Sequence, residues 1–487
     1  MPSTSRDFYD RLSRHAREIP HSIALHDGSR RLRYGELIAE LDARRSRLAR
    51  LDARRVALAL DNGVDWALWD LALLLDERVA VPVPGFFSAS QCRHLIKQAG
   101  LDAWIGSGGE TLGFATSDDP AIATRPVDAP PYLHAGTTLI TFTSGTSAAP
   151  KGVCLDTAAP LTVAASLAEV VGPLGIQRHL AMLPLATLLE NIGGLYVPLW
   201  LGATSCVPGM ATVGMQGASG FAPGAALAAI DAFRPHSLIL VPQLLQALVE
   251  ARPRAPENLR FIAVGGACVT DTLLARAHDG GWPVYQGYGL SECASVVCLN
   301  RPGEMARGVG RPLAHAQVQV GSSGEVTVHG ATMLGYLGEP AAGNGHASGD
   351  LGHWQGDALV LDGRRREVFI TAYGRNVDPQ WVEGELCTRP AIAQALVYGE
   401  ALPRNRALIV PAGADIDDAR LAEAIDAVNV TLPDYARVHD WCRCAPFTLN
   451  NHQRTANGRL RRDAIFAVYG DWLNAHSDTV SQGEICP

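Results

Sequence analysis

The sequence lacks a long apolar run of the kind that crosses a membrane. A bilayer span needs about 20 consecutive apolar residues, and in the apolar stretch Trp66–Val83 the run is broken by four charged residues. The first residues, Met1–Pro20, also lack the apolar centre of a signal peptide. We therefore expect a cytoplasmic protein without a membrane span.

The sequence also lacks metal-site cysteine spacing and an excess of basic charge. The ten cysteines are scattered, and the close pair Cys442 and Cys444 has a C-x-C spacing that matches neither a zinc site nor a thioredoxin site. Acidic residues number 49 against 41 basic ones, which gives a formal net charge of −8. Nucleic-acid-binding proteins usually present a basic surface, so we expect no nucleic-acid partner.

What the sequence does contain is typical of a large globular protein. Of its 487 residues, 47% are hydrophobic and 18% are charged, a balance typical of folded chains and, at this length, of more than one domain. Short apolar runs alternate with helical patterns. The expected strands include Val56–Leu60, Ser237–Val241, Phe261–Val264 and Val284–Gln286. Strands that alternate with helices predict parallel βαβ units and an α/β fold.

The pattern changes near residue 310. Gln317–Val320 and Glu325–Val328 alternate around the turn Gly321–Gly324, which predicts an antiparallel hairpin. Ala358–Leu361 predicts a further strand. Gly202–Gly224 is rich in small residues and proline, and we expect a surface loop or crossover there.

The segment after Gly363 is expected to form a second, smaller α/β domain. Its last helix is visible in apolar residues at helical spacing: Ile465, Val468, Tyr469, Trp472 and Leu473. Such a stripe predicts that the helix packs against the core of this domain.

The most informative segment is Thr141–Val153, which reads TFTSGTSAAPKGV. It follows a predicted strand, Thr137–Phe142, and carries hydroxyl side chains, one glycine and Lys151. A loop of this kind offers backbone N–H groups, hydroxyls and a point charge to phosphate oxygens. It does not have the Gly-Lys-Ser/Thr order of the Walker loop, and taken alone it is equally compatible with a polar turn.

Three further segments give this loop its context. They read QGYGLSE at 286–292, SGDL at 348–351 followed by GRRREVFITAYGRNVDPQWVE at 363–383, and TANGRLRR at 455–462. Together with the loop, in this order and spacing, they resemble the adenylate-forming superfamily of acyl-CoA synthetases, aryl-acid ligases, luciferases and peptide-synthetase adenylation domains. The resemblance extends over nearly the whole chain.

The resemblance implies an α/β fold and a reaction. Residues 1–364 would form a large N-terminal domain with two similar mixed αβ sheet subdomains and a small β-barrel. Residues 365–487 would form a small, mobile α+β C-terminal domain that swivels about a hinge near Arg366. The implied reaction uses ATP and Mg²⁺ to activate a carboxylic acid as an acyl-adenylate, with release of pyrophosphate. The acyl group then passes to the thiol of coenzyme A or of an acyl carrier protein, with release of AMP.

The resemblance also assigns residues to the nucleotide. The loop around the phosphates would include Thr143, Ser144, Gly145, Thr146 and Lys151. Adenine and ribose would be held by Gly265, Gly266, Ala267, Gly287, Tyr288, Asp350 and Arg364. Tyr288 would stack on the adenine ring, and the carboxylate of Asp350 can accept hydrogen bonds from both ribose hydroxyls.

The residues implied in the chemistry are Lys151, Ser291, Glu292 and Arg459. Ser291 offers a hydroxyl to a phosphate or a carboxylate, and Glu292 would be the Mg²⁺ ligand. Arg459 stands where most of the family has lysine. Arginine keeps the positive charge, but its planar fork differs from a point charge on a flexible stem.

The acyl pocket would include Thr187, Gly266 and Gly289. Thr187 replaces a histidine or another aromatic residue, which alters the wall between the acyl pocket and the ATP site. Tyr373 stands where many members of the family have glycine, on a strand that lines the thiol tunnel. Acceptor binding is therefore the step that the sequence supports least.

Three functions stay open at this stage. The first is an ATP- and Mg²⁺-dependent acid–thiol ligase. The second is a stand-alone adenylating enzyme that loads only an acyl carrier protein. The third is a catalytically weak acyl-nucleotide-binding protein, for which Arg459 and Tyr373 are the reasons. The acid is expected to be a fatty acid or a hydroxybenzoate-like aryl acid.

Overall fold

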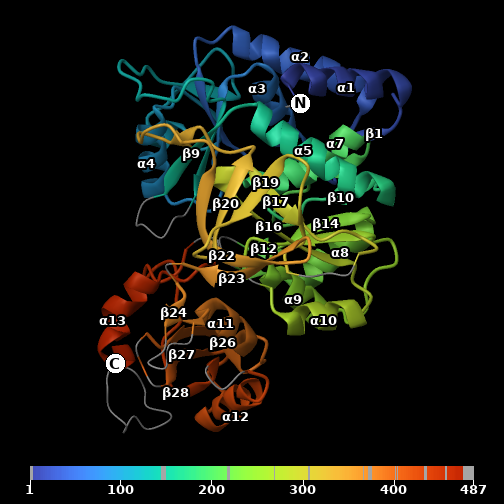
Figure 1. The fold of residues 1–487 in the computed structure, drawn as a ribbon. Coiled ribbons are helices and arrows are strands. Elements are labelled where there is room, and N and C mark those ends of the chain that lie inside the picture. The colour runs from blue at the N-terminus through green and yellow to red at the C-terminus, as the bar shows by residue number, and fades with distance from the viewer. Residues whose placement is uncertain are drawn as a thin grey trace.

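A computed structural model describes most of the chain. The described residues are 4–143, 150–216, 220–267, 269–304, 308–365, 367–370, 376–400, 402, 404–432, 436–455 and 458–474. Figure 1 shows a larger N-terminal part and a smaller C-terminal part. Among the described helices, none has the length and apolar character that crossing a membrane requires.

A nine-stranded mixed sheet forms one half of the N-terminal part. Its spatial order is β18 (Arg311–Pro312), β17 (Ser295–Leu299), β16 (Val284–Leu290), β15 (Phe261–Val264), β14 (Ser237–Leu240), β10 (Arg178–Leu180), β11 (Thr204–Cys206), β1 (Ile23–His26) and β2 (Arg31–Arg33). The strands from β16 to β1 pair in parallel, which confirms the βαβ prediction. The expected loop Gly202–Gly224 is partly wrong, because β11 lies inside the sheet with Ser205 and Cys206 buried.

An eight-stranded mixed sheet forms the other half. Its order is β21 (Gly335–Tyr336), β9 (Lys151–Leu155), β8 (Leu139–Thr143), β4 (Val79–Pro82), β3 (Arg55–Ala59), β5 (Ala103–Gly106), β7 (Ile122–Thr124) and β6 (Ala115–Thr116). Strands β8 and β9 pair antiparallel, with Thr143 opposite Lys151. The phosphate-loop segment therefore joins two neighbouring strands.

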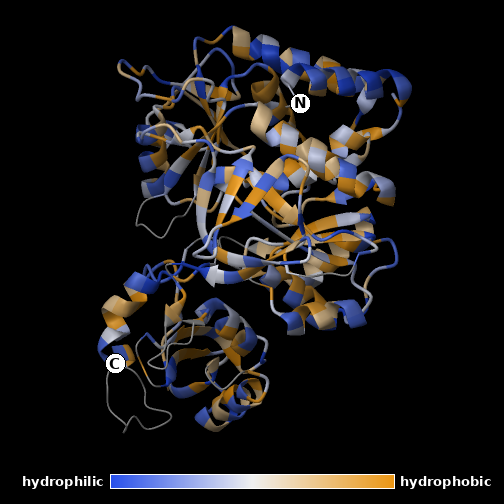
Figure 2. Ribbon diagram, viewed as in Figure 1, coloured by the Kyte–Doolittle hydropathy of each residue, from blue (hydrophilic) through white to orange (hydrophobic). Residues whose placement is uncertain are grey.

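Helices cover the two sheets. They are α1 (Ser5–Glu18), α2 (Tyr34–Ala49), α3 (Val64–Leu75), α4 (Ala89–Ala99), α5 (Ala158–Val171), α6 (Leu188–Glu190), the π-helix η3 (Asn191–Tyr196), α7 (Val197–Leu201), α8 (Pro223–Phe233), α9 (Pro242–Ala251) and α10 (Asp271–Asp279). Short 3₁₀ turns are η1 (Glu110–Leu112), η2 (Gly172–Leu174) and η4 (Ser291–Cys293), and β12 (Met215–Gln216) pairs with β13 (Gly220–Phe221). The outer helices α1 and α2 are largely hydrophilic, whereas the helices α5 and α7 beneath them are mostly apolar (Figure 2).

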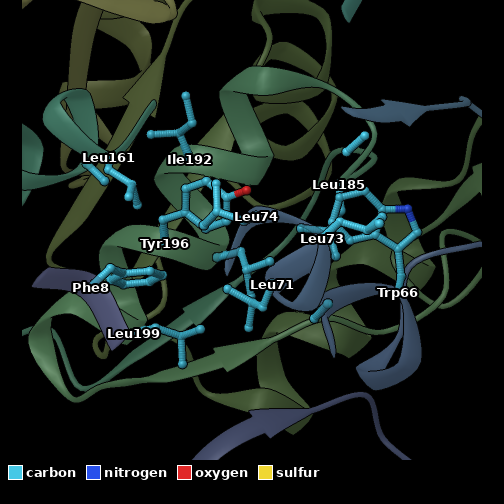
Figure 3. Packing of buried hydrophobic residues seen from close by; sticks show 14 of the residues in the cluster. Phe8, Trp66, Leu71, Leu73, Leu74, Leu161, Leu185, Ile192, Tyr196 and Leu199 are labelled. Carbon is cyan, nitrogen blue, oxygen red and sulfur yellow. The ribbon is translucent and has the colours of Figure 1, made fainter. Parts of the chain in front are cut away.

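The largest apolar core joins α1 and α3 to η3 and α7. Figure 3 shows Phe8, Leu71 and Leu74 packed near Tyr196 and Leu199. The rings of Phe8 and Tyr196 lie 5.9 Å apart between centroids. Because this core fixes α7 and η3 against the sheet, it also fixes the helices that border the candidate site.

A four-stranded antiparallel sheet follows, where the resemblance implies a small barrel. Its order is β19 (Ala316–Val320), β20 (Glu325–Gly330), β22 (His346–Gln355) and β23 (Ala358–Arg364). The predicted hairpin is confirmed, with Val318 opposite Val328. Strand β22 brings the SGDL segment to the lower edge of the N-terminal part (Figure 1).

The C-terminal part has its own sheet and its own core. Strands β26 (Ile392–Tyr398), β27 (Asn405–Pro411) and β28 (Val438–Arg443) pack with α11 (Pro379–Cys387), α12 (Asp418–Asn429) and α13 (Arg462–Asn474), and β24 (Phe369–Ile370) pairs with β25 (Asn376–Val377). In α13, Ile465, Tyr469 and Leu473 are buried, but Val468 is 56% exposed and does not pack.

The fold class is confirmed as mixed α/β with a large N-terminal and a smaller C-terminal part. The apolar clusters of the two parts share no residue: the four N-terminal clusters end at Leu361, and the two C-terminal ones begin at Phe369. We propose that the domain boundary lies between Arg364 and Arg365. The hinge residue Arg366 lies outside the described residues.

Candidate active site

The phosphate-loop hairpin brings a lysine to the mouth of a cleft. Strand β8 ends at Thr143 and β9 begins at Lys151, so both residues stand at the same end of the hairpin. The Lys151 ammonium donates to Glu339 Oε1 at 2.9 Å and lies 4.8 Å from the ring centroid of Tyr336. The predicted phosphate ligands Ser144, Gly145 and Thr146 lie outside the described residues.

Glu292 faces the same place from the end of β16. It belongs to the 3₁₀ turn η4, and its Oε1 accepts a hydrogen bond of 2.8 Å from the hydroxyl of Tyr336. Burial and the neighbouring Glu292 carboxylate raise the pKa of Tyr336 above its ordinary value. Tyr336 therefore stays a neutral donor, and it links Glu292 to Lys151.

Glycines form the wall of the cleft between β15 and β16. Gly265 and Gly266 follow β15, and Gly266 has a φ of +82° that glycine adopts without strain. Gly289 lies at a register shift between β16 and β17, where a Cβ would overlap the carbonyl oxygen of Ser295. The missing side chains leave room for a flat ligand against the backbone.

Tyr288, Asp350 and Arg364 form one hydrogen-bonded group beside this wall. The Tyr288 hydroxyl donates to Asp350 Oδ2 at 2.6 Å, and the Arg364 Nε donates to Asp350 Oδ1 at 2.8 Å. Burial and the Asp350 charge raise the pKa of the Tyr288 phenol far above its ordinary value. The Asp350 carboxylate is thus oriented in advance by a neutral donor and a cation, with lone pairs left for further donors.

Arg459 reaches the cleft from the C-terminal part. It closes a turn in which its N–H donates to Thr455 Oγ1 at 3.0 Å and its carbonyl accepts from the Thr455 N–H at 2.7 Å. Burial, and then the charge of Arg364, lower the pKa of its guanidinium, while Glu367, Asp350 and Glu292 oppose that shift. Arg459 therefore lies within the electrostatic reach of the two carboxylates that the sequence assigned to ribose and Mg²⁺.

Thr187 also lines the cleft. It precedes α6, and its hydroxyl donates to the carbonyl oxygen of Pro184 at 2.7 Å. The hydroxyl hydrogen bond therefore stabilises the turn from Pro184 to Thr187. Ser291 lies between Tyr288 and Glu292 at the start of η4.

These residues meet in one cleft of about 2770 Å³. The predicted residues that line it are Thr143, Lys151, Thr187, Gly265, Gly266, Ala267, Gly287, Tyr288, Gly289, Ser291, Glu292, Arg364 and Arg459. Asp350 is 5% exposed and lies behind the lining residues Ser348 and Gly349. The structure thus brings together every predicted site residue that it describes.

The sequence did not point to three other residues of the cleft: Tyr336, His346 and Glu367. Burial lowers the pKa of the His346 imidazole, although Glu292 and Asp350 oppose the shift. Tyr336 contacts Glu292 across 44 positions of sequence. No local pattern signals such a contact.

The donor set fits a magnesium nucleotide better than a transition metal. Within the described residues, no three His, Cys, Asp or Glu side chains are grouped as a metal site of their own. A single carboxylate, such as Glu292 here, together with substrate phosphates is the arrangement that Mg²⁺ commonly uses. Lys151 and Arg459 add positive charge on the same cleft.

Comparison with known proteins places the chain in a family. The family model "AMP-binding enzyme" matches residues 12–337, and the model "AMP-binding enzyme C-terminal domain" matches residues 366–480. These matches cover most of the chain, so the protein belongs to the AMP-binding enzyme family. The resemblance inferred from the motifs is confirmed.

Curated relatives are named as CoA ligases. The 2-succinylbenzoate–CoA ligase of Bacillus subtilis (strain 168) is 30% identical over 282 residues, 54% of this chain and 56% of the relative. This chain thus spans just over half the length of that relative. Feruloyl-CoA synthase of an Amycolatopsis species is 28% identical over 84% of this chain and 89% of the relative. A long-chain-fatty-acid–CoA ligase of Mycobacterium tuberculosis is 33% identical over 31% of this chain and 27% of the relative.

A solved structure shares the fold. O-succinylbenzoate coenzyme A synthetase from Bacillus subtilis, in complex with ATP and magnesium ion, superimposes with a TM-score of 0.72. The alignment covers 93% of this chain and 98% of the other at 23% identity. At this identity the likeness supports the fold and its two-part architecture.

Proposed function

We propose that this protein is an AMP-forming acid–coenzyme A ligase. A carboxylate attacks the α-phosphorus of ATP, pyrophosphate leaves, and an acyl-adenylate forms. The thiol of coenzyme A then attacks the acyl carbon, and AMP leaves. The acid is a fatty acid or an aryl acid.

The observation that carries the proposal is the convergence of charge on one cleft from both parts of the chain. Two anions must meet in the first step, so the site has to neutralise charge and hold the reactants in line. Lys151 lies on the side of the phosphate loop, and Arg459 arrives from the C-terminal part. Lys151 would neutralise charge on the β- and γ-phosphates, and Arg459 would stabilise the charge that develops between the carboxylate and the α-phosphate.

The nucleoside would be held by groups that are already positioned. Tyr288 lines the cleft, and its hydroxyl donates to Asp350. Arg364 fixes the other oxygen of Asp350. Adenine would lie along Tyr288 and the Gly265–Ala267 turn, and the ribose hydroxyls would donate to Asp350.

Mg²⁺ would be held by Glu292 and the phosphates of ATP. When bound, the ion neutralises phosphate charge and polarises the phosphoryl oxygens. Tyr336 keeps one Glu292 oxygen engaged, which leaves the other oriented for the ion. The structural neighbour in complex with ATP and magnesium supports this choice of metal.

Coenzyme A is the proposed acceptor because the named relatives are CoA ligases. Loading of an acyl carrier protein has no support among them. The position Tyr373, which the sequence singled out for the acceptor, lies outside the described residues.

The test measures the two half-reactions separately. Purified protein with Mg²⁺, ATP and an acid should exchange labelled pyrophosphate into ATP, and added coenzyme A should give a thioester and AMP. Exchange without any acid, or phosphate release in place of pyrophosphate, would overturn the proposal. Adenylation with thioester formation only on phosphopantetheinylated carrier protein would exclude coenzyme A as the acceptor. Absence of exchange with every acid would favour a catalytically weak binding protein.

A further inference from the structure

Beyond the glycine wall the cleft continues into a region that we call the deep lobe. We define the deep lobe by seven apolar side chains of the cleft lining: Leu167, Val171, Ile176, Val197, Leu201, Phe261 and Leu299. They come from α5, the loop after η2, α7, β15 and β17. Most of them are buried, with Leu299 at 2% and Phe261 at 5% exposure, so the deep lobe is an interior space and not a surface groove.

The deep lobe is long because its walls run along helices and strands. One wall runs from the π-helix η3 into α7, where Val197 and Leu201 are about 6 Å apart along the axis at 1.5 Å per residue. On the other wall, Phe261 and Ala263 lie on one face of β15 and Gly265 follows that strand, and all three line the cleft. Four residues of extended chain span about 13 Å, which sets the length of this wall.

Two polar side chains that also line the cleft, His179 and Ser237, are hydrogen-bonded to each other. The His179 imidazole bonds Ser237 Oγ through Nδ1 at 3.0 Å and Glu190 Oε1 through Nε2 at 2.8 Å. Glu190 Oε2 also accepts from the Leu183 N–H at 3.0 Å. Among the described residues, the buried polar atoms that lack a partner include none from these side chains or from the lobe.

We infer that the acid carries an elongated apolar tail that fills the deep lobe, and is not a single benzoate ring with polar substituents. The inference rests on the proposed function and narrows its substrate. A ring hydroxyl placed among these seven apolar side chains would lose its hydrogen bonds to water, which is unfavourable. A single ring would also leave the far end beside Val171 and Phe261 unfilled, whereas a chain gains contacts along the whole length.

The first experiment compares acids by ATP–pyrophosphate exchange. The panel is butanoic, hexanoic, octanoic, decanoic and dodecanoic acid, with cinnamic, benzoic and para-hydroxybenzoic acid. In the fatty series kcat/KM should rise about fourfold per methylene until the lobe is full. The fatty series and cinnamic acid distinguish a flexible chain from a ring on an extended linker. A preference for benzoic or para-hydroxybenzoic acid over octanoic acid would overturn the inference while leaving the proposed function intact.

The second experiment tests whether the tail of the acid reaches Val171. Val171→Phe should lower kcat/KM at least tenfold more for decanoic acid than for butanoic acid, because only the longer tail reaches this position. Val170→Phe is the matched control, since Val170 is the adjacent residue and does not line the cleft. Equal losses for butanoic and decanoic acid would overturn the inference.

A complementary variant covers the case in which Val171→Phe does not fold. Val171→Ala enlarges the far end and should move the optimum to a longer acid. An unchanged chain-length optimum in this variant would also count against the deep lobe. Absence of exchange with every acid in the wild-type protein would instead contradict the proposed function.

Discussion

Lys151 is one of only two lysines in the chain, the other being Lys97. Nearly all other basic side chains are arginine, including Arg459 where most of the family has lysine. A lysine retained at 151 fits a role that needs a compact point charge on a flexible stem. Arginine at 459 follows the general usage of this chain, so it is not by itself a sign of lost catalysis.

Glu292→Gln tests the proposed magnesium site by removing one negative charge. Glutamine keeps an oxygen that can accept from Tyr336 but removes the negative charge. The Mg²⁺ concentration for half-maximal pyrophosphate exchange should rise about tenfold, equivalent to ~1.4 kcal/mol. The distant exposed residue Glu257 provides the control Glu257→Gln. A Mg²⁺ titration that matches wild type would mean that Glu292 does not bind the ion.

Asp350→Ala tests the ribose site. Two hydrogen bonds to a charged acceptor are lost, each worth ~1.5–3 kcal/mol, so the KM for ATP should rise more than tenfold. Tyr288→Phe keeps the ring and removes only the donor to Asp350, and a smaller rise of about threefold is expected. Steady-state kinetics against ATP at saturating acid give both values. A change below about threefold in Asp350→Ala would argue against contact with ribose.

At the scale of elements, a buried carboxylate joins α3 to the π-helix η3. Asp70 is 2% exposed, and its Oδ2 accepts from Asn191 Nδ2 at 3.0 Å and from the Tyr196 hydroxyl at 2.8 Å. Burial raises its pKa from 3.8 to about 6 despite these donors. The raised pKa means that ionisation favours the unfolded chain.

The pH dependence of this site has a definite sign. Below about pH 4 the Asp70 carboxyl is protonated in both the folded and the unfolded chain, so it does not lower the free energy of unfolding. Above about pH 6 it is ionised in both states, and its burial lowers the free energy of unfolding by the full amount. Asp70→Asn can offer one oxygen to both donors and does not titrate. Relative to wild type, its free energy of unfolding should be equal near pH 4 and higher by up to ~3 kcal/mol near pH 7. Urea unfolding at both pH values measures the difference.

Asp70→Leu is the contrasting variant. This substitution removes the acceptor of the hydrogen bonds from Asn191 and Tyr196. The free energy of unfolding should therefore fall by about 2 kcal/mol or more at both pH values. If Asp70→Asn and wild type keep the same difference at pH 4 and pH 7, the carboxylate is not titrating in the folded protein as described.

Local patterns predicted most elements, and the exceptions have physical reasons. The hairpin at 316–330 and the parallel strands were predictable because alternation and apolar runs are local properties. Strand β11 was hidden in a glycine-rich segment, since its three residues are held by β10 and β1 and not by their own composition. Val468 continues the helical stripe of α13 but faces solvent, because periodicity does not define where a core ends.

The candidate site was predictable as a set of residues but not as a network. The motifs named Tyr288 and Asp350 separately, yet their hydrogen bond joins positions 62 apart. Tyr336 had no motif, although it bridges Glu292 and Lys151. The deep lobe was also hidden, because its length depends on how α5 and α7 lie over the sheet.

At the scale of the whole molecule, α11 of the C-terminal part rests on α9 and α10 of the N-terminal part. Gln246 Nε2 donates to the carbonyl oxygen of Cys387 at 3.1 Å, and the Thr272 hydroxyl donates to Glu385 Oε2 at 2.9 Å. Such an interface is compatible with the swivel that the family resemblance implies.

If the C-terminal part swivels in this way, Arg459 serves adenylation and leaves the cleft for thiol transfer. We predict that Arg459→Ala lowers pyrophosphate exchange at least about tenfold, which needs only ~1.4 kcal/mol of lost transition-state stabilisation. Thioester formation from chemically made acyl-adenylate should be nearly unchanged. Arg459→Lys should retain or raise exchange, since it restores a point charge near Glu292 and Asp350.

A purely structural role for Arg459 predicts a different result. Arg462, at the start of α13, illustrates such a role: its guanidinium is paired with Glu383 at 2.7 Å within the C-terminal part. Arg462→Ala leaves a buried carboxylate without its cation, so it should lower the melting temperature and both half-reactions together. Arg459→Ala should leave the melting temperature near wild type and separate the two half-reactions. Parallel losses in Arg459→Ala, like those expected for Arg462→Ala, would remove its catalytic role, because a residue that acts only in adenylation cannot slow a step that begins from the finished adenylate.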